Sequence, residues 1–291
     1  MNGVHTTNTP GGLVEALPAL FGFVPTDSVA VLTTMANGRR IGFRLRIDRR
    51  EPHQRAEMAD TIAGHVSRHV GSGGAVIVIV LADDLDQGMS DLAAVLDALS
   101  EPVIVAGVAH LGVFTEWGTG NVWPYEDPAH STATVAAVAA GQNVEASRAA
   151  LAASLTPTYA NAYVPEGEAD TALCLAVLAG THDLTDEARV AFTRAVRNIG
   201  VRDYLWGEAT AETAGRHAAT WTAVALLTHR RDVAGLYAMA AMATYLSGDG
   251  ARGRDLADIA LKHDPEQSLA KIALTAIDAG MSPARWFEMV Q

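Results

Sequence analysis

Acidic side chains that could do chemistry lie at the ends of two segments that we expect to be β-strands. Asp83, Asp84 and Asp86 directly follow the apolar run 75–82, and Asp48 ends an earlier alternating segment. Ligands of open α/β sheets gather outside the carboxyl ends of the strands, where carboxylates could hold Mg²⁺ for phosphoester chemistry. The alternative is a polar loop whose aspartates form turns and assist the following helix.

A second group is basic. Residues 39–55 hold seven arginines against Asp48 and Glu51, in a chain whose formal net charge is −12. Guanidinium groups match phosphate oxygens in pairs, so these side chains could bind phosphate or a nucleic-acid backbone. The candidates are Arg44, Arg46, Arg49 and Arg50. The alternative is an edge strand whose charges prevent pairing with another sheet.

Two histidines and one cysteine complete the candidates. His65 and His69 stand four residues apart on a predicted helix, a spacing that can ligate one metal ion. The segment is HVSRH, without the glutamate of a metalloprotease helix and without an obvious third ligand, so a surface or core-edge pair is the alternative. Cys174 lies in an apolar helical run and is expected to be an inert core residue.

The composition predicts a soluble, cytoplasmic protein. With 291 residues, 49% of them apolar, the chain can form one large or two ordinary domains with a substantial core. Its longest apolar run is far shorter than the roughly 20 residues of a membrane helix, and the start MNGVHTTNTPGG predicts no signal peptide. The single cysteine excludes intrachain disulfides, and the negative charge disfavours nucleic acid and anionic membranes as partners.

The first half of the chain predicts a layered α/β domain over residues 1–157. A β-hairpin is expected over residues 28–48, turning at Asn37-Gly38, a dipeptide that tolerates positive φ. A helix over 57–70 precedes the run 75–82, which is apolar on both faces and therefore predicts a central strand. Ser90 is expected to cap a helix over 91–99. Further strands are expected over 101–110 and 112–117, so the sheet should be mixed.

The second half, residues 165–291, predicts an all-helical domain, so the fold class is α+β. The segment 156–170 is the expected linker. Residues 232–265 resemble one tetratricopeptide-type helix pair, in which single repeats need neighbours to bury their faces. The predicted helices span 185–198, 212–228, 232–247, 250–263 and 267–279, and the residues that fit the repeat are Tyr237, Ala241, Ala260 and Pro265.

Four segments carry a family resemblance. They read GGLVEALPALFGFVPTDSVAVL, RLRID, AAGQNVEASRAAL and YLSGDGARGRDLADIALKHDP. Together they resemble a family of proteins of actinobacteria and their phages that is catalogued as a domain of unknown function. The resemblance spans nearly the whole chain. It implies a two-part layout, a cytoplasmic location and an origin in a phage or its host, and it carries over no catalytic residue.

Three functions follow as hypotheses. The first is a non-enzymatic adaptor or assembly protein that acts through a protein partner or as a homo-oligomer, since helix pairs commonly present surfaces to proteins; it needs no cofactor. The second is a metal-dependent enzyme, acting on phosphoesters or nucleic acid with Mg²⁺ at Asp48 and residues 83–86. The third is a nucleic-acid-associated regulator that uses the arginine face.

Overall fold

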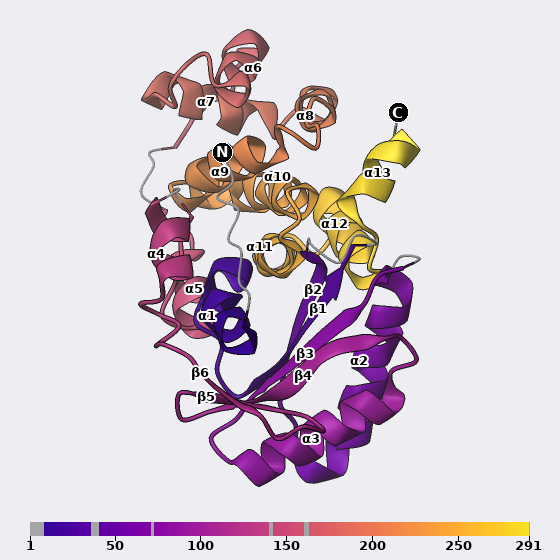
Figure 1. Ribbon diagram of the computed structural model, residues 1–291. Helices are drawn as coiled ribbons and strands as arrows, with labels where there is room; N and C mark the ends of the chain where they lie inside the picture. The colour runs from indigo at the N-terminus through magenta and orange to yellow at the C-terminus, as the bar shows by residue number, and fades with distance from the viewer. Residues whose placement is uncertain (1–8, 36–40, 71–72, 140–141, 160–162, 291) are drawn as a thin grey trace. The chain divides into compact units, whose positions relative to one another are not determined.

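The computed structural model describes residues 9–35, 41–70, 73–139, 142–159 and 163–290. The chain forms two compact units, Met1–Leu151 and Ala152–Gln291. A six-stranded mixed sheet with helices makes up the first unit, and the described part of the second unit is helical (Figure 1). The predicted α+β class is therefore confirmed.

The sheet has the strand order β2-β1-β3-β4-β5-β6. Neighbouring strands are antiparallel except for β3 and β4, which are parallel and joined by helix α3. The strands are β1 (Ser28–Thr34), β2 (Ile41–Asp48), β3 (Val76–Leu81), β4 (Val103–His110), β5 (Val113–Glu116) and β6 (Val122–Pro124). The antiparallel β1 and β2 confirm the predicted strand pair, while the predicted turn Asn37-Gly38 lies outside the described residues.

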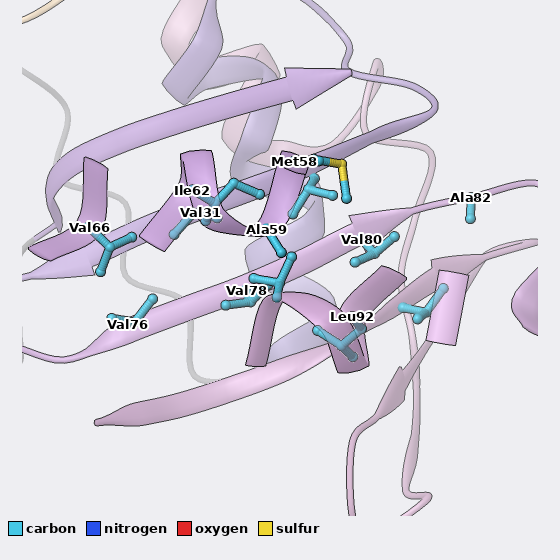
Figure 2. Packing of buried hydrophobic residues seen from close by; sticks show 13 residues of the cluster. Val31, Met58, Ala59, Ile62, Val66, Val76, Val78, Val80, Ala82 and Leu92 are labelled. Carbon is cyan, nitrogen blue, oxygen red and sulfur yellow. The ribbon is translucent and has the colours of Figure 1, made fainter. Parts of the chain in front are cut away.

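Strand β3 is central and buried on both faces, as its unbroken apolar sequence predicts. Val76, Val78 and Val80 meet Val29 and Val31 of β1 in one hydrophobic cluster (Figure 2). The same cluster contains Met58 and Ile62 of α2 and Leu92 and Val95 of α3, all buried. This core holds α2 and α3 against one face of the sheet.

The helices of the first unit lie on both sides of the sheet. Figure 1 shows α2 and α3 together on one side and α1 on the other. The bounds are α1 (Pro10–Phe21), η1 (Pro52–Gln54), α2 (Arg55–His69), α3 (Leu85–Ala98) and α4 (Thr132–Ala139). Helix α5 (Arg148–Ser154) contains the boundary between the two units at Leu151. The prediction that Ser90 begins a helix is wrong, because Asp84 accepts a hydrogen bond from the Gln87 amide and so caps α3 six residues earlier.

The second unit packs its helices around α10, whose residues from Leu236 to Leu246 are all buried. The bounds are α6 (Thr171–Ala179), α7 (Asp186–Ala195), α8 (Ile199–Gly207), α9 (Ala214–Leu226), η2 (Arg230–Asp232), α10 (Val233–Leu246), α11 (Gly250–His263), α12 (Ser268–Asp278) and α13 (Pro283–Val290). Helices α10 and α11 are the two helices expected over 232–265. Their tetratricopeptide identity remains a prediction.

Helices α8 and α13 were not predicted, and each begins at or just after the end of a predicted helix. Asn198 caps α8 by accepting a hydrogen bond from the Val201 amide. Ser282 accepts one from the Arg285 amide, and Pro283 stands at the first position of α13, where its missing N–H is not needed. Among the helices in the described part of the chain, none combines the length and hydrophobicity that crossing a bilayer requires.

Candidate functional site

The sheet order separates the carboxylates that were proposed as a metal site. Strand β1 lies between β2 and β3, and Ser28 pairs with Asp48 on one side and with Leu81 on the other. The backbones of Asp48 and Leu81 are thus two strand spacings apart, about 10 Å. Among the described residues, no three His, Cys, Asp or Glu side chains are grouped so that they could hold a metal ion.

Asp84 and Asp86 belong to the beginning of α3. Asp84 is its N-cap, and Asp86 lies in its first turn, where a carboxylate is stabilised by the positive end of the helix dipole. Their placement agrees with the alternative considered for this segment, in which the aspartates assist the following helix. Asp83 is exposed and precedes the cap.

A buried carboxylate, Asp91 of α3, organises the surrounding charges. Its side chain is fully buried and accepts hydrogen bonds from Arg49 Nε (2.6 Å) and Arg55 Nε (2.5 Å). Arg49 also donates to Asp27 Oδ1 (2.8 Å), and Arg55 donates to the Gln87 side chain (3.3 Å). The connection between β2 and α2 is thereby tied to α3, and Arg49, a predicted phosphate ligand, is engaged by two carboxylates.

A shallow pocket of about 260 Å³ lies beside this network. Arg55 and Gln87 line it together with Asp84, Asp86, Pro52 and Ser90. It lies next to the C-terminal end of β3 and the first turns of α3, the end of the sheet where α/β proteins bind ligands. The pocket presents both a guanidinium group and carboxylates, so its charge favours neither anions nor cations strongly.

Arg46 on β2 is held inside the first unit instead of facing solvent. Its side chain is only 9% exposed and contacts Asp48 Oδ1 (2.5 Å), the Thr26 carbonyl (3.2 Å) and the Phe23 ring (5.7 Å to the centroid). Arg148 binds the other oxygen of Asp48 at 3.3 Å. Burial lowers the pKa of Arg46, and the charge of Arg148 adds to this effect. Of the other candidates on this face, Arg44 is half-buried and Arg50 is exposed.

His65 and His69 face an aromatic ring. The ring of His69 stacks on Phe43 with centroids 4.0 Å apart, and His65 lies 6.5 Å from the same ring. Burial, followed by the charges of His65 and Arg68, lowers the pKa of His69 to about 4. The pair therefore packs α2 against β2, in line with the core-edge alternative.

Cys174 is fully buried, and burial raises the pKa of its thiol to about 12. The expectation of an inert core cysteine agrees with this environment.

Sequence reasoning missed Asp91, Arg55 and Arg148 as partners. Asp91 could have been found, because Gly88, Asp91, Leu92 and Val95 form the helical stripe that the structure buries. A carboxylate within an apolar stripe requires a cationic partner. Arg148 lies 100 residues from Asp48 in the sequence, and only the fold brings the two together.

A comparison of the sequence with family models gives one matching family. The model described as domain of unknown function DUF4192 matches residues 10–174 and 159–284. The chain belongs to this family. No curated protein and no solved structure matches the chain.

Proposed function

We propose that this member of the DUF4192 family is a non-enzymatic adaptor or assembly protein that acts through protein–protein contacts. The observation that carries the proposal is the apolar surface on helices α8 and α13 of the second unit. Ile199 of α8 is 66% exposed and Met289 of α13 is 61% exposed, and Tyr204 is exposed as well. Large apolar side chains that gather on a surface mark sites of interaction with proteins.

The two helices meet at one aromatic contact. Trp206 of α8 and Trp286 of α13 have ring centroids 6.1 Å apart, and Trp286 also meets Tyr245 of α10 edge-on. No described side chain of α13 is fully buried, although the helix carries Trp286, Phe287 and Met289. A helix with a strongly apolar side gains stability only when that side is covered, and a partner would supply the missing cover.

Native mass spectrometry of the protein purified from its own host is the test. We expect an assembly heavier than the 30.5 kDa chain, consisting either of several copies or of this chain with another protein. The variant Met289→Glu should dissociate it. The control Val135→Glu, which changes an equally exposed residue of α4, should leave it intact. A chain that stays monomeric, with no protein captured by crosslinking in the host, would contradict the proposal.

The proposal includes a location in the cytoplasm of an actinobacterial host or, if a phage encodes the protein, in the virion. The tetratricopeptide-like helix pair α10–α11 supports the adaptor function, because such helix pairs commonly present surfaces to protein partners.

The metal-dependent enzyme is the alternative function, and its test is a calorimetric titration with Mg²⁺ or Mn²⁺. Binding that is lost in Asp84→Asn would favour the enzyme; no heat of binding would remove it.

A further inference from the structure

A second basic cluster lies in the second unit, where the predicted linker meets the turn before α10. We call it the tyrosine–arginine patch and define it by Tyr159, Tyr163, Arg230, Arg231 and His263. Tyr159 and Tyr163 come from the linker segment, the arginines from η2 and His263 from the end of α11. The patch combines aromatic rings with cations, which was not apparent from the sequence because its parts are up to 104 residues apart.

Tyr163 is surrounded by cations and still faces solvent. Its hydroxyl accepts a hydrogen bond from Arg231 Nη1 at 2.8 Å. The guanidinium carbons of Arg231 and Arg197 lie 5.8 and 6.0 Å from the ring centroid, and His229 meets the ring edge-on. The residue nevertheless remains 50% exposed. These contacts fix the orientation of the ring and leave part of it open to a ligand.

Tyr159 forms a similar arrangement with Arg230. The Arg230 guanidinium carbon lies 5.1 Å from the centroid of the Tyr159 ring. His263 Nε2 is 3.2 Å from the Tyr159 hydroxyl, and its ring meets the tyrosine edge-on at 6.2 Å. Arg230 and His263 are both exposed. A guanidinium group held against a ring offers its outer plane to a further flat group.

The charges of the patch are only partly neutralised. Arg197 donates two hydrogen bonds to the buried Asp232, at 2.7 and 2.9 Å, and Arg231 forms an ion pair with Glu166. For Arg230 the described part of the chain offers no carboxylate within ion-pair distance. Three arginines therefore face two carboxylates, and next to His263 in the sequence stand one further cation, the exposed Lys262, and one further carboxylate, Asp264. The surplus is positive, in a chain whose net charge is −12.

We propose that the tyrosine–arginine patch binds single-stranded nucleic acid. Phosphates would bind Arg230 and Arg231, and unpaired bases would stack on Tyr163 and on the guanidinium plane of Arg230. Proteins that bind single strands combine a positive surface with aromatic rings and arginine planes on which bases stack. A duplex keeps its bases stacked inside and cannot use the rings. An acidic peptide needs only the charge and leaves the rings unexplained.

Fluorescence anisotropy of the full chain with a labelled single strand of about 20 nucleotides, as DNA and as RNA, is the test. We expect binding at about 50 mM salt that weakens steeply towards about 200 mM, because phosphate contacts release counterions. Tyr163→Ala should weaken binding about tenfold through loss of one stacking surface. Tyr163→Phe keeps the ring and should bind nearly as the parent does. Arg230→Ala should weaken binding by about tenfold as well.

Arg285→Ala is the matched control, because it removes one exposed arginine of α13 outside the patch. It should change the affinity less than about twofold, as expected for a distant charge in salt. Circular dichroism melts establish that each variant folds. Absence of binding at low salt would overturn the proposal, as would equal losses in Arg230→Ala and Arg285→Ala. A duplex or poly-glutamate that competes as well as the single strand would also overturn it, because the rings would then have no role.

Discussion

The two arginine clusters of this protein differ in what neutralises them. In the first unit, Arg49 and Arg55 converge on the buried Asp91, and Arg46 is held by Asp48. In the second unit, Arg230 lies against a tyrosine ring, with no carboxylate beside it among the described residues. A guanidinium group paired with a buried carboxylate ties structural elements together, whereas an exposed one that lies against a ring remains available to a ligand.

From the sequence alone, the first cluster is the stronger candidate for a binding surface. From the partners of each charge in the structure, the second cluster is. The segment 39–55 contains the densest run of arginines, yet Arg46 and Arg49 are committed to partners within the unit. Arg230 and Arg231 are an unremarkable pair in the sequence. Density of charge along the chain therefore indicates less about binding than the partners that the fold places beside each charge.

The largest expected effect is that of Asp91→Ala. The change leaves Arg49 and Arg55 without their shared carboxylate in a partly buried place. We expect a loss of about 3–5 kcal/mol in the free energy of unfolding, measured by urea denaturation. Asp86→Ala is the control, an exposed carboxylate on the same helix, and it should lose less than about 1 kcal/mol. Equal losses would show that the Asp91 network does not hold the first unit together.

The second prediction compares the contributions to stability of two arginines, Arg197 beside Tyr163 and Arg230 beside Tyr159. Arg197→Ala leaves the buried Asp232 unpaired and should lower the free energy of unfolding by about 3 kcal/mol. Arg230→Ala removes an exposed side chain and should change it by less than about 0.5 kcal/mol. Thermal or urea unfolding measures both. A loss in Arg230→Ala as large as that in Arg197→Ala would assign the patch a structural role and remove the contrast with the first unit.

The third prediction concerns pH and the packing of β2. Folding lowers the pKa of His69 from 6.5 to about 4. Between these two pH values the unfolded chain therefore binds a proton at His69 and the folded chain does not. The contribution to stability is present above pH 6.5 and is lost as the pH falls towards 4. His69→Phe keeps a ring on Phe43 and removes the titration, so stability should fall less steeply over this range. Some pH dependence should remain, because burial also lowers the pKa of His217.

An unchanged slope in His69→Phe would contradict this assignment. The measurement is urea denaturation at a series of pH values, with His53→Phe as the control. His53 is an exposed histidine of η1, so this control makes the same substitution without removing a ring stacked on Phe43.

The smallest expected effect is that of Tyr163→Phe on stability. The variant loses the hydrogen bond from Arg231 and keeps the ring contacts of the patch. Because both side chains are about half exposed, water replaces the lost bond, and we expect a change of about 0.5 kcal/mol or less. Tyr237→Phe is the comparison, since it removes a buried hydrogen bond to the Leu155 carbonyl and should lose about 1–2 kcal/mol. A loss of stability in Tyr163→Phe as large as that in Tyr237→Phe would mean that the hydrogen bond in the patch contributes as much to folding as the buried one.

The sequence by itself determined the elements that depend on neighbouring residues. The unbroken apolar run of β3 predicts a strand covered on both faces, and the alternation of β2 predicts its pairing with β1. The change from strands to helices after the middle of the chain gave the α+β class. Boundaries were less certain because one residue can end a helix or begin the next, as Asn198 does for α8.

Only the tertiary structure decided which charges meet. Strand order places β1 between Asp48 and the start of α3, and the packing of α3 on the sheet brings Asp91 to Arg49 and Arg55. The patch joins Tyr159 to His263 across 104 residues. Hydrophobic periodicity repeats within a few residues and is therefore visible in the sequence, whereas electrostatic pairing depends on distances in space that only the folded chain sets.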